Sequence, residues 1–344
     1  MSNKIKVLVV DDSAFYRKII SEVLGMDSQI EVVGTAANGK IALDLIEKLN
    51  PDVMTLDLEM PEMDGIETLE NIRKRNLQVG VIVFSAHSKE GAELTFSALE
   101  KGAFDFVTKP SRSSFSENIN EIRLSLIPKI KACYLKRKLR TPPLKQIPDL
   151  LRNPSFPAIK KEVVGIGSST GGPNALKKIF SRLSPHISSP IFIVQHMPPI
   201  FTRQFAESLD KMSQIKVKEA ENGEKISERT AYIAPGDYHM EVEDERIRLH
   251  KGPPENNCRP SVDVLFRSMA RTYGERTLAI ILTGIGNDGL KGVKRLKEKG
   301  AYVIAQDEET SVVWGMPRAV VEEGLADKVL PLEQIPIAIS KLVR

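Results

Sequence analysis

This sequence of 344 residues has few cysteines and no long apolar runs. It also lacks a large excess of one charge and shows no internal repeats. Its two cysteines, Cys133 and Cys258, form no C-x-x-C pair and are too few for a disulfide framework, which favours a reducing compartment. No apolar run approaches the roughly 18 residues of a membrane span. The apolar start of the chain ends in two aspartates, unlike a signal peptide. We therefore expect a cytoplasmic protein without membrane insertion.

Charge is nearly balanced, with 49 Lys and Arg residues against 45 Asp and Glu residues. Such a balance gives no general case for nucleic acid as a partner. One basic stretch runs from Lys129 to Lys145, where seven Lys or Arg residues occur without an acid. Because no DNA-reading motif accompanies it, we favour a solvated helix face followed by a linker over a surface for acidic partners.

The sequence does contain a regular alternation of short Val- and Ile-rich runs with helical stretches, in two blocks. Residues 1–125 and 161–344 both show it, and a basic, proline-containing stretch over 126–160 separates them. Alternation at this spacing predicts parallel sheets that helices cover on both faces. We expect an N-terminal (βα)5 domain, whose last helix runs on to about Leu139, then a linker. A three-layer α/β/α domain with a mostly parallel sheet should follow.

The expected elements can be placed on the sequence. In the first block, the apolar runs predict strands over Ile5–Val10, Val32–Thr35, Val53–Leu56, Val79–Phe84 and Phe104–Val107. In the second block, they predict strands over Val163–Gly167, Ile191–Gln195, Ala231–Ala234, Leu278–Thr283, Tyr302–Gln306 and Lys328–Leu330. Two further runs predict an antiparallel hairpin, Tyr238–Val242 with Arg246–His250.

Acidic residues gather at the ends of strands in the first block. Asp11 and Asp12 end the first strand, and Asp57 follows the third. Because strand ends of an open parallel sheet meet at one rim, three carboxylates there require a hard cation such as Mg²⁺. Ser85 ends the fourth strand and Lys109 follows the fifth. Together these groups can hold a phosphoryl group on a carboxylate.

This set, with Pro110 after the lysine, resembles the receiver domain of response regulators over about the first 125 residues. The resemblance implies a flavodoxin-like fold in which Asp57 accepts phosphate from a histidine kinase. It implies that Mg²⁺ is bound by Asp57, by Asp12 directly and by Asp11 through water. A degenerate receiver kept as a docking domain is the alternative.

Three further receiver residues take their roles from the same resemblance. Lys109 would pair with the phosphate, and Ser85 would hydrogen-bond it. Phe106 falls at the position of the family's aromatic switch residue and, being Phe, has no hydroxyl to reorient.

The second block opens with Gly-Ser-Ser-Thr-Gly at 167–171, between an expected strand and an expected helix. This is G-x-S-x-G with Ser169 at its centre, in the context of a nucleophile elbow. The helix N-terminus supplies backbone N–H groups that can hold an oxyanion. A Ser- and Gly-rich helix cap is the simpler alternative, and Ser168 is a weaker candidate for the nucleophile.

A serine nucleophile needs a base and a carboxylate that orients the base. His196 follows the strand Ile191–Gln195, and Asp288 follows the strand that ends near Thr283, so both should lie on the rim that carries Ser169. His239 is the one serious competitor for the base. The chain order Ser, His, Asp differs from that of the α/β-hydrolases, so we expect a triad on a different sheet.

Cys258 and Arg259 stand side by side, which could lower the thiol's pKa and make it a nucleophile. We prefer a pocket-wall or packed cysteine, because no His is near it in sequence and the serine already fills that role. Arg259 either binds the substrate or pairs with an acid.

Six motifs resemble the catalytic domain of the CheB family of chemotaxis protein-glutamate methylesterases, in order over 161–344: Ser-Ser-Thr-Gly-Gly (168–172), Gln-His-Met-Pro (195–198), Ile-Ala-Pro-Gly (233–236), Arg-Pro-Ser-Val-Asp (259–263), Thr-Gly-Ile-Gly-Asn-Asp-Gly (283–289) and Trp-Gly-Met-Pro (314–317). The resemblance implies Ser169 as nucleophile, His196 as base and Asp288 as its orienter. It implies hydrolysis of γ-glutamyl methyl esters to methanol and deamidation of certain glutamines, with methyl-accepting chemotaxis receptors as substrates.

In this scheme, backbone N–H groups near Thr170 and Ile285 stabilise the oxyanion, and the catalytic domain has no cofactor. Ile285 stands where the family often has Met. The change should be mild if this position acts only through its backbone N–H, whereas substrate preference could differ if the Met side chain shapes the pocket. We expect a monomer whose unphosphorylated receiver covers the catalytic cleft.

Two rival functions stay open from the sequence. Gly-Ile-Gly-Asn-Asp-Gly at 284–289, with Asp307 after the next strand, also matches a dinucleotide-binding fingerprint. It would leave the serine elbow and His196 unexplained. The other rival is a catalytically inactive response regulator that acts as a binding module.

Overall fold

The structure is a computed structural model that describes residues 4–110, 115–138 and 156–343. The chain divides into two compact units, Met1–Thr141 and Pro142–Arg344, and each is described by itself. None of the helices in these described ranges is both long enough and apolar enough to cross a bilayer.

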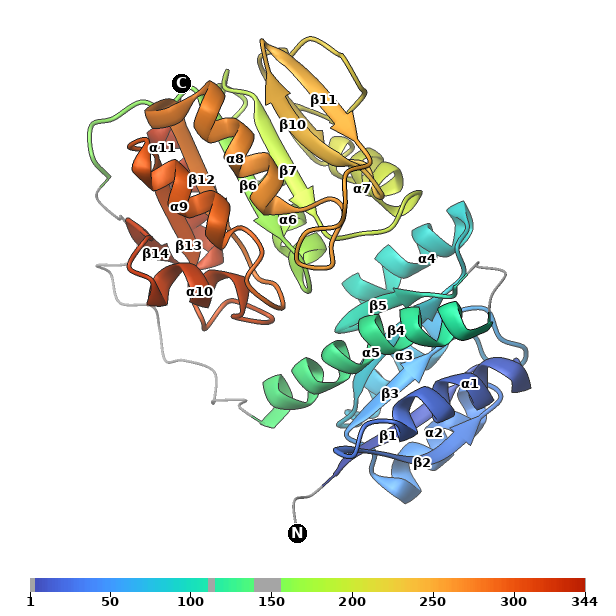
Figure 1. The fold of residues 1–344 in the computed structure, drawn as a ribbon. Helices are drawn as coiled ribbons and strands as arrows, with labels where there is room; N and C mark the ends of the chain where they lie inside the picture. Colours follow the sequence, from blue (N-terminus) through green and yellow to red (C-terminus); the bar gives the residue numbers. More distant parts are fainter. Residues whose placement is uncertain (1–3, 111–114, 139–155, 344) are drawn as a thin grey trace. The chain divides into compact units, whose positions relative to one another are not determined.

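The N-terminal unit is built on a five-stranded parallel sheet in the order β2-β1-β3-β4-β5 (Figure 1). Its strands are β1 Ile5–Val10, β2 Ile30–Ala36, β3 Val53–Leu56, β4 Gly80–Ser85 and β5 Asp105–Thr108. Every residue of β3 and β4 is buried, as Val- and Ile-rich strands in the middle of a parallel sheet should be. The flavodoxin-like (βα)5 fold that the sequence predicts is confirmed.

Helices cover both faces of this sheet. On one face α1 (Ala14–Gly25) packs against α5 (Phe115–Lys138), and on the other lie α2 (Gly39–Leu49), α3 (Gly65–Lys74) and α4 (Lys89–Glu100). Helix α3 begins with a capping box, in which the Asp64 carboxylate accepts from the N–H of Glu67 and the Glu67 side chain accepts in return.

Helix α5 corrects the boundary at residue 125. It continues to Lys138, and its residues Leu126, Ile130 and Cys133 are buried in the core of the N-terminal unit. The first part of the expected linker over 126–160 therefore belongs to this unit, because an apolar face binds it to the sheet. The expected helix end at Leu139 lies outside the described residues, next to the last helical residue that the structure gives.

The C-terminal unit has a seven-stranded sheet in the order β14-β13-β12-β6-β7-β9-β8, with parallel pairs throughout (Figure 1). Its strands are β6 Val163–Ser168, β7 Ile191–Gln195, β8 Lys216–Glu219, β9 Thr230–Ile233, β12 Thr277–Ile281, β13 Tyr302–Gln306 and β14 Lys328–Leu330. The expected strands are confirmed within two residues. The edge strand β8 was not predicted, since its Lys-Val-Lys-Glu sequence carries only one apolar residue.

Two layers of helices sandwich this sheet, which confirms the expected α/β/α architecture. One layer holds α8 (Val262–Thr272), α9 (Leu290–Glu298) and α10 (Met316–Glu322), and the other holds α6 (Gly172–Phe180), α7 (Phe201–Asp210) and α11 (Ile335–Leu342). The expected hairpin forms from β10 (His239–Glu243) and β11 (Arg246–His250), and β10 packs on α8.

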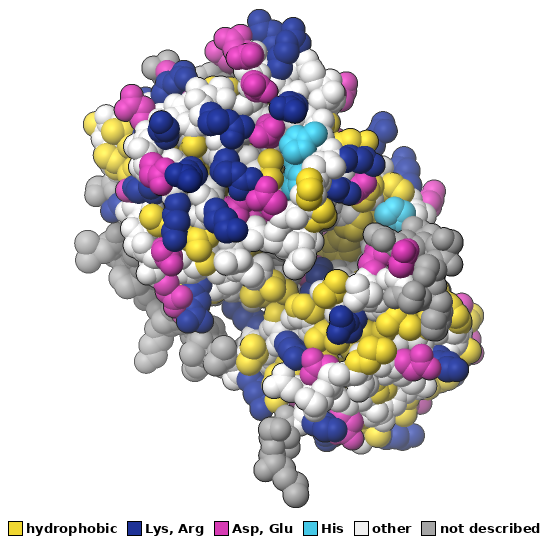
Figure 2. All heavy atoms as spheres, viewed as in Figure 1, with side chains coloured by type: hydrophobic (Ala, Val, Ile, Leu, Met, Phe, Trp, Pro, Cys, Tyr) yellow, Lys and Arg dark blue, Asp and Glu magenta, His cyan; other side chains and the backbone are white. Residues whose placement is uncertain are grey.

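The helical face of α8 and α9 carries many Lys and Arg side chains, but Asp and Glu lie among them (Figure 2). Ion pairs account for several of these cations, namely Lys294–Glu323, Arg295–Glu298 and Lys297–Asp327. The face is therefore mixed in sign rather than a continuous basic surface.

Candidate active site and phosphorylation site

Three neighbouring strands of the C-terminal sheet bring Ser169, His196 and Asp288 to one rim. The central strand β6 ends just before Ser169, β7 ends just before His196, and β12 on the other side leads into the loop that carries Asp288. The helices that follow β6 and β12, α6 and α9, lie on opposite faces of the sheet. The sheet therefore changes its winding direction between these two strands, which is where open α/β sheets form their binding crevice.

Ser169 stands in a tight turn between β6 and α6. Its N–H donates to the Thr283 carbonyl at 3.0 Å, and Gly171 at the turn has φ of 78°. A side chain on Gly284 would place its Cβ 2.8 Å from the Cβ of Ser169. The loop after β12 thus approaches the serine with its bare backbone, and a glycine is needed there for steric reasons.

The neighbouring Ser168 has a different environment. It is fully buried, and its hydroxyl donates to Gln195 Oε1 at 2.7 Å. The amide nitrogen of the same Gln195 donates to the Ser169 carbonyl at 2.9 Å. Ser168 is thus bound into the support of the turn, whereas Ser169 is partly exposed, so the geometry favours Ser169 as the nucleophile.

His196 and Asp288 form a direct pair. Nε2 of His196 lies 2.8 Å from Oδ2 of Asp288. Burial lowers the pKa of the imidazole, but the adjoining Cys258 sulfur and the Asp288 carboxylate outweigh burial and raise this pKa to about 10. Burial also raises the pKa of Asp288, but the hydrogen bond and charge of His196, with other donors, lower it to about 2. The pair therefore stabilises the imidazolium that a general base becomes.

Asp288 is held by more donors than its histidine. Its Oδ1 accepts from the Ser261 hydroxyl at 2.7 Å and from Asn256 Nδ2 at 2.8 Å, and the backbone N–H groups of Val262, Asp263 and Gly289 also donate to the carboxylate. A carboxylate with this many donors stays ionised and acts only as an acceptor. Ser261 lies in one of the sequence motifs, but no role was predicted for it. Asn256 was not predicted at all, because nothing in the local sequence around Asn256 marks it as a site residue.

The second ring nitrogen of His196 faces Cys258. The two are 62 positions apart in sequence, yet Cys258 Sγ lies 3.5 Å from Nδ1. Within the described part of the C-terminal unit, the Ser169 hydroxyl makes no hydrogen bond to His196. The local sequence around Cys258 does not indicate this contact, which arises because the loop before α8 carries the thiol to the end of β7.

The loop after β7 packs against the Ala-Pro-Gly-Asp segment at 234–237. A side chain on Gly236 would meet the backbone of Pro198 and Pro199 at 2.2–2.8 Å. The N–H of Gly236 also donates to the Thr202 hydroxyl at 3.0 Å, which fixes the segment against the start of α7. Close backbone contact thus holds the segment after His196, at Pro198 and Pro199, against Gly236.

The two expected oxyanion positions come from loops that are bonded to each other. The Thr283 hydroxyl donates to the Thr170 carbonyl at 2.8 Å and accepts from the N–H of Val313 at 2.9 Å. In the described part of this unit, the N–H of Ile285 has no protein acceptor. Thr170 and Ile285 therefore lie on connected backbone beside Ser169, and their role as oxyanion donors stays a prediction.

The competing residues have other partners. His239 is buried in the hairpin, where Nε2 lies 3.0 Å from the Pro253 carbonyl and its ring lies 5.4 Å from that of His250 at a tilted angle. Burial lowers the pKa of His239. Arg259 binds the Asp237 carboxylate and the Gly252 carbonyl, so it pairs with an acid.

The turn formed by the glycine pattern at 284–289 leaves no space for a dinucleotide. A Cβ on Gly284 would meet Met316 Sδ at 2.3 Å, so packed side chains fill the space beside this turn. Asp307, the expected ribose ligand, instead accepts from the N–H and hydroxyl of Thr310 in a local turn.

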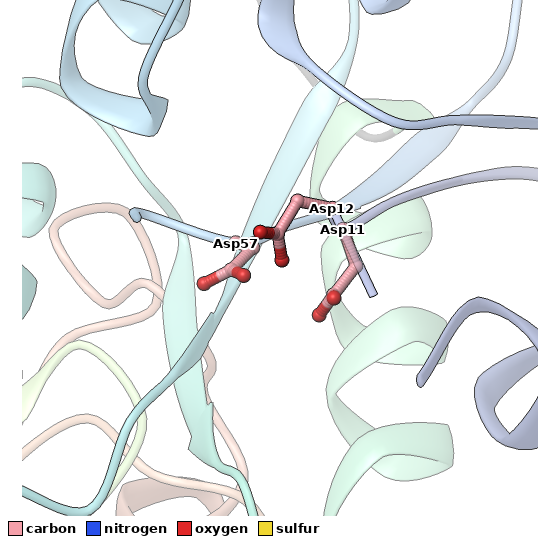
Figure 3. Close-up of side chains that lie close together, drawn as sticks. All are labelled: Asp11, Asp12 and Asp57. Atoms are coloured by element: carbon pink, nitrogen blue, oxygen red, sulfur yellow. The ribbon is translucent and has the colours of Figure 1, made fainter. Parts of the chain in front are cut away.

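In the N-terminal unit, Asp11, Asp12 and Asp57 converge at the ends of the adjacent strands β1 and β3 (Figure 3). One ligand atom from each lies within 4.8 Å of the others. Lys109 Nζ reaches Asp57 Oδ2 at 2.6 Å and Asp11 Oδ2 at 3.0 Å. Burial and the Asp57 charge raise the pKa of Asp11 to about 6, so a further cation would relieve repulsion among these acids. An all-oxygen donor set of this kind fits Mg²⁺.

The remaining receiver residues are buried near this rim. The Ser85 hydroxyl donates to the Gly91 carbonyl at 3.0 Å and accepts from the Thr95 hydroxyl at 2.7 Å, so it faces α4 rather than Asp57. The Phe106 ring is buried, and its carbonyl accepts from Lys129 Nζ at 2.7 Å. The contact of Ser85 with a phosphate stays a prediction.

Comparison with known proteins gives the same two-part description. The family model for the response regulator receiver domain matches residues 7–119, and that for CheB methylesterase matches residues 164–339. A protein-glutamate methylesterase/protein-glutamine glutaminase of Pyrococcus horikoshii is 45% identical over 357 aligned positions, covering 100% of this chain and 95% of that protein. A protein of the same name from a Nocardioides species is 47% identical, covering 99% and 96%.

A solved structure also matches the C-terminal part. The crystal structure of the Thermotoga maritima CheB methylesterase catalytic domain is 45% identical, with a TM-score of 0.51, over 53% of this chain and 99% of that one. Because both family models match and full-length relatives exceed 40% identity, the relationship extends over the whole chain. This chain therefore belongs to the CheB methylesterase family and carries a response regulator receiver domain in its N-terminal part.

Proposed function

We propose that this protein is a phosphorylation-regulated methylesterase of chemotaxis. It removes methyl groups from glutamate methyl esters on methyl-accepting chemotaxis receptors, and it converts receptor glutamines to glutamate as a second activity. The observation that carries this function is the 2.8 Å bond between His196 and Asp288 at the strand end next to Ser169. The names of the full-length relatives, protein-glutamate methylesterase/protein-glutamine glutaminase, support hydrolysis of glutamate methyl esters and of glutamines in a protein.

The reaction begins when the Ser169 hydroxyl attacks the ester carbonyl carbon and the neutral form of His196, which the raised pKa makes the minor form at neutral pH, takes its proton. Because Nε2 donates to Asp288, Nδ1 is the nitrogen that receives this proton. The carbonyl oxygen becomes an oxyanion, which backbone N–H groups near Thr170 and Ile285 stabilise.

Collapse of the tetrahedral intermediate breaks the bond to the methoxy group, which leaves as methanol with the proton from His196. Water then attacks the acyl-serine with the same base, releasing the glutamate carboxylate. For a glutamine substrate the leaving group is ammonia instead, and every other step is the same.

The receiver would control this activity through Asp57. A histidine kinase, or a small phosphodonor, transfers its phosphoryl group to the Asp57 carboxylate, and Lys109 pairs with the phosphate. The three carboxylates of Figure 3 would hold Mg²⁺, which when bound offsets their charge and that of the phosphoryl group. Phosphorylation then relieves inhibition of the catalytic unit by the receiver.

Methanol release from a methylated receptor fragment tests the proposal, with wild type and Ser169→Ala, each with and without acetyl phosphate and Mg²⁺. We expect wild-type release to rise with the phosphodonor and Ser169→Ala to release none. Asp57→Asn should keep the basal rate and lose the response to the phosphodonor. Absence of methanol from wild type under both conditions would support a binding module instead.

A further inference from the structure

Cys258 occupies a fixed position beside the general base. It lies between β11 and α8, partly exposed, and its Sγ is 3.5 Å from His196 Nδ1, within hydrogen-bonding range for sulfur. Two backbone bonds anchor it, since the N–H of Cys258 donates to the Glu255 carbonyl at 2.8 Å and the Cys258 carbonyl accepts from the N–H of Glu255 at 3.1 Å. The next residue, Arg259, is bound to Asp237. The thiol is therefore placed by its backbone rather than by a flexible loop.

The hydrogen bonds of the His196 imidazole determine the role of its contact with Cys258. Asp288 is ionised and only accepts, so Nε2 of His196 carries a hydrogen and donates it. Nδ1 is then the nitrogen that must take the serine proton. Among the described residues, the partner of Nδ1 in the resting site is Cys258 and not Ser169. The thiol and the serine hydroxyl thus compete for the same nitrogen of His196, Nδ1.

We propose that Cys258 is a positioning residue for His196: its sulfur shares a proton with Nδ1, fixes the ring opposite Asp288, and releases this nitrogen to Ser169 when an ester binds. This inference rests on the proposed function, in which His196 is the base. Cys258 does not act as the nucleophile, because the turn, the helix N-terminus and the bare backbone of Gly284 all lie beside Ser169.

The charged groups around the ring leave this role to Cys258. Asp288 faces the ring from the loop before α9, and Cys258 faces it from the loop before α8. Asp263, at the start of α8, is one step removed: it accepts from Asn256 and from the backbone of α9. Arg267 on α8 is bound to Glu255. Among the residues that the structure describes, Cys258 is therefore the titratable group in contact with the nitrogen that reacts.

Alkylation of the full-length protein by iodoacetamide at pH 7 tests the contact without using the esterase reaction. The Cys258 sulfur forms a bond to the reagent's carbon, iodide leaves, and His196 Nδ1 receives the thiol proton. We expect His196→Gln to lower the rate at Cys258, followed by peptide mass spectrometry, by about tenfold or more. Ser169→Ala should leave the rate within about twofold, since it removes a competitor and no proton acceptor. The buried Cys133 is an internal control that stays unmodified. Equal rates in wild type and His196→Gln would overturn the proposal.

Ester hydrolysis supplies the second test. We expect Cys258→Ala to lower kcat about tenfold with KM nearly unchanged, because the base is less well aligned. The acid limb of its pH–rate profile should move to lower pH, since the sulfur that favours the protonated ring is gone. Cys258→Ser, whose hydroxyl can bond to Nδ1, should recover most of kcat. A wild-type kcat and pH profile in Cys258→Ala would contradict the role. If Cys258→Ala behaves like wild type while Ser169→Ala is inactive, the role of Cys258 is wrong and the proposed function still stands.

Discussion

Nε2 of His196 lies 2.8 Å from Oδ2 of Asp288, so this base meets its carboxylate through Nε2 and presents Nδ1 to the reaction. The arrangement uses the opposite ring nitrogen from the serine protease triad, in which Nδ1 faces the acid. The role of the carboxylate is the same, since it fixes the tautomer and stabilises the imidazolium.

Asp288→Asn should therefore lower kcat by about 10³–10⁴, because an amide can stabilise the wrong tautomer and carries no charge. KM should change little, since Asp288 is buried behind the base. Steady-state methanol release over a range of ester concentrations separates the two constants. A loss confined to KM would show that Asp288 serves binding rather than the base.

Ser261→Ala removes a donor from the same carboxylate. Its hydroxyl lies 2.7 Å from Asp288 Oδ1, in a buried setting. We expect the C-terminal unit to lose about 1–3 kcal/mol of unfolding free energy, the usual contribution of a hydrogen bond to a charged group. Urea unfolding followed by Trp314, the one tryptophan of the chain, measures this.

Ser184→Ala is the matched control, since Ser184 only accepts from a backbone N–H in an exposed loop. Its unfolding free energy should stay within about 0.5 kcal/mol of wild type. If the two variants lose equal stability, the bond to Asp288 contributes nothing specific.

The raised pKa of His196, which the Cys258 sulfur and the Asp288 carboxylate cause against the effect of burial, also predicts how stability depends on pH. A raised pKa in the folded state, about 10 against 6.5, means that folded protein binds more protons between these values. The contribution of His196 to the free energy of unfolding is complete below about pH 6.5 and is lost as pH rises through about 10. We expect Trp314-detected stability to fall between pH 6.5 and 10 in wild type, and to fall less in His196→Gln. An equal slope in both proteins would place the titrating group elsewhere.

The raised pKa of the receiver acid Asp11 also makes stability fall as pH rises, but here the ionised group lowers stability at neutral pH. The pKa of Asp11 is raised to about 6 from 3.8, so the folded state binds more protons between these values and stability decreases as pH rises through them. Asp11→Asn should therefore stabilise the N-terminal unit at pH 7, by an amount on the order of 1–3 kcal/mol.

Hydrogen exchange of receiver peptides in the full-length chain measures that gain. Adding Mg²⁺ should slow exchange in wild type and have a smaller effect in Asp11→Asn, which has lost a ligand. Slower exchange in wild type than in the variant without Mg²⁺ would contradict the repulsion among these acids.

The sequence predicted the frame of the molecule because local patterns encode it. The buried runs that became β1, β3, β7 and β13 were placed to the residue, since continuous Val and Ile between turns mark a buried parallel strand. The residues at strand ends followed from the topology of a parallel sheet. The polar edge strand β8 carried no such clear signal and was not predicted.

The connections within the site were harder to predict. Cys258 and His196 are 62 positions apart, and Asn256 reaches Asp288 over 32 positions, so no spacing rule relates them. Such contacts depend on how the loop before α8 folds over the strand ends, which local propensity does not determine. The roles of Ser168 and Ser169 likewise separated only when Gln195 was seen to bind the first and support the second.

The most direct test compares Ser168→Ala with Ser169→Ala in methanol release from a methylated receptor fragment, with acetyl phosphate and Mg²⁺ present. The two variants lose the same hydroxyl one position apart. We predict that Ser169→Ala loses all esterase activity and stays folded, while Ser168→Ala keeps kcat within about tenfold and loses stability through its buried bond to Gln195. Activity that survives in Ser169→Ala and disappears in a folded Ser168→Ala would contradict the assignment of the nucleophile.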